Sequence, residues 1–280
     1  MQDQIITVYV LCDDFLKSRQ HKDDRQAVMT MAEVMTTALV SALLFKNCLE
    51  AARIFLKEHG YIKSMLSESR LNRRIHAVGE SNWQSLFQVL ADFHHAKNDE
   101  LNYIVDSFPI QICDNYRIPR CKLYAADRKA FRGYIASKRR YFYGLRAHMI
   151  TTEAGKPVEL ILAPASTADI SGFKQLYLDL PPGSTIYADK AYMDYVCEDV
   201  LNEDTDITLV ALHRANSTRP MDGCLRYICH HYRKRIETAF SRMADFFAKR
   251  IYAITRCGVE LKICWAALAL SIDCLSAPAG

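Results

Sequence analysis

The sequence predicts an α/β protein (α+β overall) in which an all-helical N-terminal region precedes a domain of alternating strands and helices. Three observations support this prediction. Residues 1 to about 97 carry helical patterns and helix caps, whereas short apolar runs of strand length alternate with helical stretches after residue 100. The polar joint Lys97-Asn98-Asp99-Glu100 separates the two patterns. We therefore expect two domains, at 1–97 and 98–280.

Composition limits the class of protein. Half of the 280 residues are hydrophobic, which permits a sizeable core and excludes a mainly disordered chain. The ten cysteines follow no disulfide-scaffold spacing, and the N-terminal Met1-Gln2-Asp3-Gln4 lacks the basic region of a secretory signal. The longest apolar stretch, 263–270, is too short to cross a membrane and fits a buried helix. We therefore expect a cytoplasmic protein without membrane contact.

Local signals place the helices of the N-terminal region. Thr30 and Glu33 have the spacing of a capping box, which predicts a helix from there through Phe45. Asn47 repeats the capping signal and opens a second helix. Gly60 can adopt the left-handed conformation that ends this second helix.

An arginine-rich helix follows, and Ser67 is expected to begin it. Two short helices joined by a tight turn, the second rich in Arg and Asn, resemble a helix-turn-helix DNA reader. We expect Arg70, Arg73 and Arg74 to contact DNA, although an arginine-rich face is also common on plain protein surface. One more helix closes the region near His95.

After residue 100, five short apolar runs predict five strands, and three helical stretches lie between and after them. Glu153-Ala154-Gly155-Lys156 has the composition of a hairpin turn, and Asp169 is the candidate N-cap of the first helix. A last apolar helix follows Gly258. The predicted strands are 103–109, 140–151, 157–163, 184–188 and 207–212, and the predicted helices are 169–178, 192–202 and 225–247.

This order of elements resembles the ribonuclease H-like fold, with a mixed five-stranded sheet. In that layout the first strand lies at the centre of the sheet and the fourth strand pairs beside it. Asp106 on the first strand and Asp189 after the fourth would then lie side by side. Glu237, on the long helix packed over the sheet, would face them.

These three acids point to a metal site. A carboxylate on a buried strand loses hydration, and neighbouring carboxylates repel one another. Divalent cations relieve both costs, and oxygen ligands select Mg²⁺ or Mn²⁺. Two such ions can activate a water or a 3′-hydroxyl and stabilise the leaving oxygen of an in-line attack on phosphate. We therefore expect Asp106, Asp189 and Glu237 to be catalytic and to hold two ions; the alternative is three ordinary acids among 32.

Positive charge is concentrated in one segment. Between Arg117 and Arg146 ten Lys and Arg residues accompany one acid, Asp127, which gives this segment a formal charge of +9 in a chain of net charge +4. Such segregation predicts an anionic partner. The alternative is a solvated basic loop.

Five stretches carry a resemblance to bacterial insertion-sequence DDE transposases, most closely to the insertion sequence 982 family. The resemblance covers residues 100–275 and extends less distinctively into 69–74. It implies two-metal cleavage at transposon ends and joining of the freed 3′ ends to target DNA, with Asp106, Asp189 and Glu237 as the triad. The matching stretches are 104–109, 131–138, 140–145, 183–192 and 233–240.

The resemblance also implies auxiliary residues and partners. Arg233 lies one helical turn before Glu237, where related transposases place an Arg within a Tyr-x-x-Arg-x-x-x-Glu pattern. This chain departs from that pattern, with His230 at the Tyr position and Ala244 where a Lys sometimes follows the Glu. Double-stranded DNA is the expected partner, in a dimer or larger active complex associated with the bacterial nucleoid. The residues expected to hold its phosphates are Arg233, Lys190, Lys138, Arg139 and Arg140.

Two other functions remain open, a metal-dependent nuclease without strand transfer and a catalytically silent DNA-binding protein descended from a transposase. Several single residues have alternatives too. Asp114 could rival Asp106 for metal, and His148 could face the metals, although a hydrogen-bonded core histidine is the favoured interpretation. Tyr141, Phe142 and Tyr143 are expected to be core residues of their strand rather than base-stacking platforms. Cys224, Cys229, His230 and His231 do not predict a zinc site, because the Cys-x₄-Cys spacing has no second pair near it and adjacent histidines on one helix point in different directions.

Overall fold

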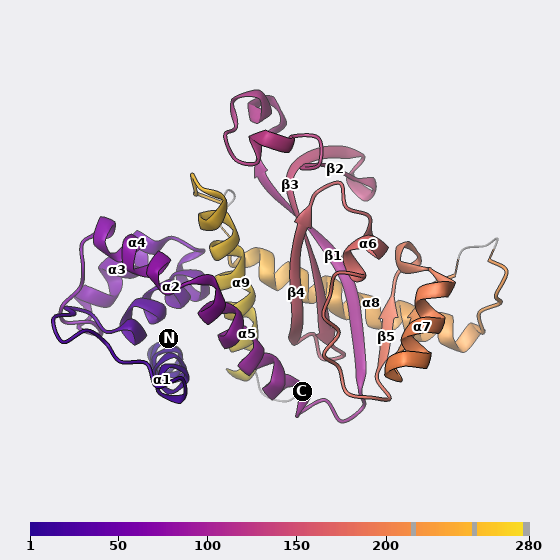
Figure 1. Ribbon diagram of the computed structural model, residues 1–280, viewed down its shortest axis with the longest axis horizontal. Helices are drawn as coiled ribbons and strands as arrows, with labels where there is room; N and C mark the ends of the chain where they lie inside the picture. Colours follow the sequence, from indigo (N-terminus) through magenta and orange to yellow (C-terminus); the bar gives the residue numbers. More distant parts are fainter. Residues whose placement is uncertain (214–216, 248–250, 277–280) are drawn as a thin grey trace. The chain divides into compact units, whose positions relative to one another are not determined.

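The computed structural model describes residues 1–213, 217–247 and 251–276, apart from the side chains of Ser137 and Ser276 (Figure 1). The chain forms two compact units. One is helical and comprises 1–90 with the described parts of 242–253 and 257–280; the other comprises the described parts of 91–241 together with 254–256. The apolar run that predicts the last helix therefore completes the helical unit. No helix within the described ranges has both the length and the apolar character to cross a bilayer.

The helical unit is built around one central helix, α2. From Ala32 to Ala42 nearly every α2 side chain is buried, and a helix that is apolar on all sides needs neighbours all round. Trp83 and Trp265 pack in the same core with ring centroids 5.8 Å apart. The helices of this unit are α1 (Gln2–Ser18), α2 (Met31–Phe45), α3 (Leu49–Glu58), α4 (Glu68–Ala77), the first part of α5 (Glu80–His95) and most of α9 (Arg256–Ser276).

The predicted capping box of α2 is confirmed, whereas the predicted N-cap of α3 is not. The Thr30 hydroxyl accepts from the Glu33 amide at 3.1 Å, and the Glu33 carboxylate accepts from the Thr30 amide at 2.7 Å. The prediction of Asn47 as an N-cap is wrong, because α3 begins after Cys48. The Asn47 side chain instead donates to the carbonyls of Phe246 and Lys262, so a tertiary contact uses it.

α3 and α4 are not joined by the tight turn of a helix-turn-helix motif. Their connection spans residues 59–67, which is longer than the three- or four-residue turn of that motif. Gly60 does adopt a left-handed conformation, φ +72°, just after α3. Ser67 occupies the N-cap position of α4, as expected, without a side-chain hydrogen bond to the helix.

The second unit is built on a mixed sheet, which has six strands over the described residues where the sequence predicts five. The order is β2-β3-β1-β5-β6, with β4 paired to β3. The first predicted strand is central, and the fourth pairs beside it in parallel, as the ribonuclease H-like layout requires. The strands are β1 (Asn102–Cys113), β2 (Arg132–Ile135), β3 (Arg140–Thr152), β4 (Pro157–Pro164), β5 (Thr185–Ala188) and β6 (Thr208–Ala211).

The strand that the sequence does not reveal is β2. It is a four-residue edge strand that pairs only with β3 and contains Gly133, so it lacks a continuous apolar run. A Cβ at Gly133 would lie 2.4 Å from the Ala165 carbonyl and 2.6 Å from the Phe142 ring. Glycine is therefore required where this strand meets the sheet.

Helices and 3-10 turns cover the sheet. In Figure 1, α8 passes behind the strands and α6 lies in front of them. The first of the three predicted helices is shorter than expected: it ends at Phe173, and the amides of Gln175 and Leu176 donate to carbonyls three residues back. Leu178, the predicted last residue, is left-handed, and the Asp179 amide donates to the Glu159 side chain. These elements are α6 (Asp169–Phe173), α7 (Tyr195–Thr205), most of α8 (Gly223–Asp245), η1 (Asn115–Arg120), η2 (Ala125–Asp127), η3 (Ala136–Lys138) and η4 (Lys190–Tyr192).

Candidate active site

The pairing register brings Asp106 and Asp189 to neighbouring positions. β1 and β5 run parallel, and their last paired residues are Ile104 and Tyr187. Asp106 and Asp189 each lie two residues further along their own chains, at the carboxyl end of β5. Residues level with each other on adjacent parallel strands are neighbours across the sheet. The register is compatible with the predicted neighbouring positions of the two acids, but only Asp189 lies at a strand end, because β1 continues from Asp106 to Cys113.

The third acid lies on the helix that covers the same face of the sheet. Phe108 stacks on Phe240 of α8, with ring centroids 5.4 Å apart and planes at 21°. Asp106 shares the face of Phe108, because side chains two apart on a strand point the same way. Glu237 lies three residues before Phe240, on the same side of α8. The aromatic contact therefore holds this stretch of α8 against the strand that carries Asp106.

Arg233 links two of these acids. Its Nη1 lies 3.2 Å from Asp189 Oδ1, and its Nε lies 3.6 Å from Glu237 Oε1. The pair with Glu237 spans one turn of α8, whereas the pair with Asp189 crosses from helix to strand end. The Lys190 amide also donates to Asp189 Oδ1, at 2.8 Å. These contacts orient the Asp189 carboxylate towards α8.

The electrostatic environment of Asp106 is unusual. Burial raises the pKa of Asp106 to about 6, against the effects of the Ser107 backbone amide and of Arg233, and with further raising by Asp169 and Asp189. The Ser107 amide donates to Asp106 Oδ1 at 2.7 Å. An additional cation nearby would therefore stabilise the ionised form of this carboxylate.

The donor chemistry fits Mg²⁺ or Mn²⁺, but the side chains do not form a closed cage. The charges of Asp189 and Arg233 act on Asp106. Asp106 and Asp189 both offer the hard oxygen ligands that these ions prefer. Glu237 is more than half exposed and faces Arg233. Within the described part of the chain, no three His, Cys, Asp or Glu side chains lie close enough together to hold one ion. Of the predicted metal set, Asp189 and Glu237 have Arg233 between them, and binding of metal by the three acids stays a prediction.

A second group of polar side chains lies on the opposite face of β1, directly behind Asp106. Ser107 Oγ donates to Asp169 Oδ1 at 2.6 Å, and Arg146 Nη1 donates to the same oxygen at 2.8 Å and to Ser107 Oγ at 3.2 Å. The expectation that Asp169 caps α6 is wrong, because Ala168 occupies the N-cap position. Arg146, a charged residue in the mostly buried part of β3, is the sequence signal that points to this cluster.

Two buried groups adjoin this cluster. His148 is fully buried, and neither ring nitrogen has a hydrogen-bond partner among the described residues, so the favoured hydrogen-bonded core histidine is only half correct. Burial lowers the pKa of His148 to about 4, partly opposed by Asp169. Burial likewise raises the pKa of the Tyr192 phenol well above its usual value. Both side chains are therefore neutral near pH 7. His148 pairs with Ser107 across the sheet, so it lies on the face opposite Asp106 rather than facing the predicted metals.

The basic residues named from the sequence lie on the surface. Lys190 is exposed directly after Asp189. Lys138, Arg139 and Arg140 are exposed around the turn that joins β2 to β3, and Arg139 takes a left-handed conformation with φ +48°. Their positions are compatible with phosphate contact, which stays a prediction.

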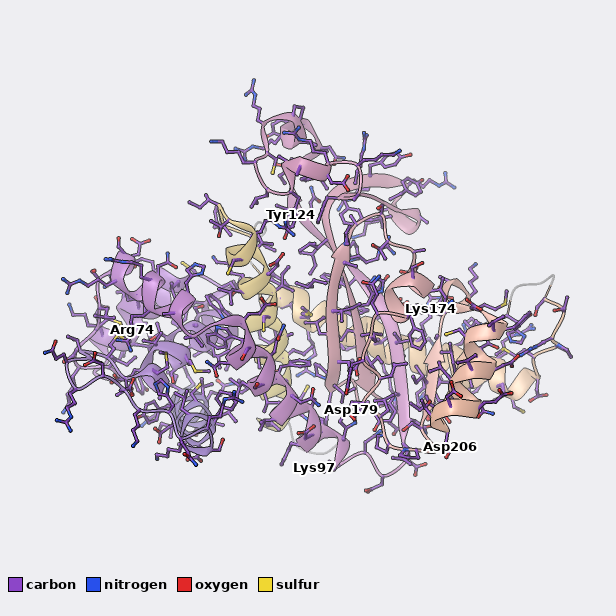
Figure 2. The ribbon with its side chains drawn as sticks, in the orientation of Figure 1. Arg74, Lys97, Tyr124, Lys174, Asp179 and Asp206 are labelled. Atoms are coloured by element: carbon purple, nitrogen blue, oxygen red, sulfur yellow. The ribbon has the colours of Figure 1, made fainter. Side chains whose placement is uncertain are left out.

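The arginines of α4 belong to the helical unit and differ from one another. Arg70 and Arg73 are exposed. Arg74, labelled in Figure 2, is half-buried; its guanidinium donates to the Met29 carbonyl at 3.2 Å and lies 3.8 Å from Asp23. Arg74 therefore ties α4 to the loop between α1 and α2, and DNA contact by this helix stays a prediction.

The aromatic run of β3 is only partly core. Phe142 and Tyr143 are fully buried, as expected, whereas Tyr141 is 54% exposed. The core prediction for Tyr141 is therefore wrong. Tyr141 shares a face of the strand with Tyr143 but lies nearer the strand end, beyond the segment around Leu123 and Tyr124 that covers Tyr143. Cys229, one of the zinc candidates, is buried with its thiol directed to the Val210 carbonyl.

Comparison with known proteins identifies the family of the chain. Searches of curated proteins and of solved structures give no match. A family model described as a transposase DDE domain matches residues 97–272, which is more than half of the chain and includes β1, β5 and α8 with Asp106, Asp189 and Glu237. The chain therefore belongs to the transposase DDE domain family.

Proposed function

We propose that this protein cleaves DNA at the ends of an insertion sequence and joins the freed 3′ ends to target DNA. The observation that carries the proposal is the convergence of Asp106 and Asp189 at the end of a parallel strand pair, with Arg233 and Glu237 facing them from α8. Membership of the transposase DDE domain family supports the same chemistry. From the sequence resemblance, we expect the protein to belong to the insertion sequence 982 family.

Asp106, Asp189 and Glu237 would hold two Mg²⁺ or Mn²⁺ ions. When bound, such ions supply an activated oxygen nucleophile and stabilise charge on the phosphate and the leaving oxygen. Water serves as the nucleophile for cleavage, and the released 3′-hydroxyl serves for joining. Arg233 is placed to bind a non-bridging phosphate oxygen once the carboxylates are otherwise neutralised, because its guanidinium already spans Asp189 and Glu237.

Double-stranded DNA, both element ends and target, is the proposed substrate. The segment 117–146 provides a formal charge of +9 and exposes Lys138, Arg139 and Arg140 in one turn. Lys190 extends the positive surface to the edge of the carboxylate site. Because a transposition complex pairs two element ends, we expect at least a dimer in the active state. We expect it to act on the bacterial nucleoid.

The decisive experiment incubates purified protein with labelled element ends, target plasmid and Mg²⁺. Wild-type protein should nick the ends and produce joined products, and Asp189→Asn should abolish both while keeping DNA affinity. Nicking without joined products would instead support a metal-dependent nuclease. DNA binding without any metal-dependent cutting by the wild type would support a silent, transposase-derived binding protein.

The matched control is Asp194→Asn. Asp194 lies just beyond η4, the 3-10 turn that follows Asp189. Its carboxylate pairs with Lys174 at 2.7 Å, away from the predicted triad. Replacing it removes one carboxylate from the same stretch of chain and leaves Asp106, Asp189 and Glu237 intact. It should therefore retain cutting, and equal loss in both variants would contradict the assignment of Asp189.

A further inference from the structure

Two tyrosines face each other at the exposed end of the β2–β3 hairpin. Tyr134 and Tyr141 are paired across the strands, with ring centroids 5.0 Å apart and planes at 54°. Their exposed fractions are 46% and 54%. Large aromatic side chains usually gain stability by burial. Two adjacent rings that remain accessible to solvent are therefore candidates for contact with a ligand.

The two residues that follow Tyr141 on β3 are buried. On the same face of β3, the Tyr143 hydroxyl donates to the carbonyls of Leu123 and Tyr124, and the Tyr143 ring is fully buried. Tyr124, labelled in Figure 2, lies in the segment that provides this cover. On the other face, the Phe142 ring is buried against Gly133. Tyr134 and Tyr141 lie beyond the cover, at the end where the hairpin turns.

Positive charge surrounds the two rings. The Arg132 guanidinium lies over the Tyr141 ring, 5.1 Å from its centroid. Lys138, Arg139 and Arg140 occupy the turn between the two tyrosines and are exposed. Asp127 is the only acid in the surrounding segment 117–146. The surface thus combines π faces with cations, which matches a strand that carries both bases and phosphates.

We propose that Tyr134 and Tyr141 form a stacking platform for an unpaired nucleobase of a DNA strand. The phosphates that flank this base would be held by Arg132 and by the 138–140 turn. The proposal rests on the proposed function, because it assumes that DNA is the substrate. It adds a binding site, outside the carboxylate centre, for single-stranded or frayed DNA. Stacking tolerates all four bases, since each presents a π face.

A purely structural role for the pair makes a different prediction. Cross-strand aromatic pairs stabilise hairpins whether or not a ligand is present. Removing the rings would then lower Tm and change affinity for paired and unpaired DNA by the same factor. The platform requires a selective loss for unpaired DNA. The ratio of the two affinities therefore separates the two roles.

The experiment measures equilibrium binding, in EDTA and at fixed salt, to a blunt duplex and to the same duplex with a short single-stranded extension. The wild type should prefer the extended duplex. Tyr134→Leu/Tyr141→Leu should reduce affinity for the extension by roughly 5- to 150-fold, the range for loss of one stacked base, and leave the blunt duplex nearly unchanged. Tyr134→Phe/Tyr141→Phe should behave as wild type. Tyr177→Leu, at a tyrosine 88% exposed elsewhere in the same unit, is the control.

A second measurement needs no substitution. A 5-iodo-2′-deoxyuridine in the extension is irradiated in complex with the wild-type protein, and cross-linked peptides are identified by mass spectrometry. Cross-links at Tyr134 or Tyr141 support the platform. Cross-links confined to other residues, or an unchanged affinity ratio in the Leu variant, would overturn it.

Both measurements use EDTA, so they are independent of cleavage. If the wild type does not cut DNA but the Leu variant selectively loses affinity for the extended duplex, only the proposed function is contradicted. Normal cutting with no selective loss would count against the platform alone.

Discussion

Arg233 and Asp189 form an ion pair between α8 and the end of β5, with 3.2 Å between Nη1 and Oδ1. The same guanidinium lies 3.6 Å from Glu237. One cation therefore lies between two of the three acids proposed to bind metal. A guanidinium is always protonated and presents donors in a planar fork, so it reduces carboxylate repulsion and can bind phosphate oxygens.

Arg233→Gln is expected to lower the single-turnover rate of Mg²⁺-dependent cleavage by roughly 10- to 100-fold, because it removes a charge that is positioned to stabilise the transferring phosphate. Arg233→Lys should retain part of the rate, since it keeps the charge and loses the fork. Quenched-flow cleavage of labelled ends measures both. A Gln variant that cuts at the wild-type rate would show that Arg233 has only a structural role.

Replacing Lys138, Arg139 and Arg140 by Gln should weaken the salt dependence of DNA binding. Each lost phosphate contact lowers the slope of log affinity against log salt by about 0.9, so three contacts would lower it by about 3. Fluorescence anisotropy at several salt concentrations gives the slope. Lys174→Gln, which removes a lysine paired with Asp194, is the control. An unchanged slope in the triple variant would remove this turn from the interface.

Gly172→Ala should destabilise the protein through His148. A Cβ at position 172 would lie 2.2 Å from Cε1 and 2.3 Å from Nε2 of the buried imidazole. Overpacking of this kind costs about 1–3 kcal/mol. Thermal melts should show a lower Tm for Gly172→Ala than for the wild type. The Tm of the double variant Gly172→Ala/His148→Ala should fall by less than the sum of the decreases in the two single variants.

The control for this pair is Gly223→Ala, at a site where an added Cβ meets nothing within 4 Å. It should leave Tm nearly unchanged. Strict additivity of the substitutions at 172 and 148 would contradict the contact.

Asp106 should make stability depend on pH in metal-free protein. Its pKa is about 6 in the folded protein, against a reference value of 3.8. Between these values the folded protein binds more protons than the unfolded chain, so this carboxyl destabilises the fold increasingly as pH rises through this window. Asp106→Asn should therefore raise stability by roughly 1–3 kcal/mol at pH 8 in EDTA and have little effect at pH 4.

Mg²⁺ should reverse that order at pH 8, because an ion bound only by the folded wild type stabilises it. Calorimetry in EDTA and in Mg²⁺ measures both arms. If Asp106→Asn is no more stable than the wild type at pH 8 in EDTA, the burial of this carboxylate is wrong. If Mg²⁺ stabilises both proteins equally, Asp106 is not a ligand.

Much of the fold follows from local patterns. The capping box at Thr30 and Glu33 forms as its spacing indicates, and the turn at 153–156 joins β3 to β4. The apolar runs locate the long strands and both C-terminal helices. These features depend on residues close together in sequence, so a one-dimensional pattern contains them. The candidate acids were found in the same way, as charges within or beside apolar runs.

Other features depended on partners distant in the sequence. Glu159 accepts from the Asp179 amide just beyond the stretch predicted to be helical, and Asn47 donates to the carbonyls of Phe246 and Lys262 instead of capping α3. Asp169 pairs with Arg146 instead of capping its helix. In each case a polar side chain has a local and a tertiary partner available, and spacing alone does not rank them.

By itself, the sequence determined the helical and α/β regions, the order of the main strands and the identity of the three candidate acids, because periodicity and charge placement are local properties. Only the tertiary structure decided the edge strand β2, the exposure of Tyr141, the place of α9 in the helical unit and the position of Arg233 between Asp189 and Glu237. These depend on which surfaces pack together. Packing is set by contacts between residues far apart in the chain, which no single segment encodes.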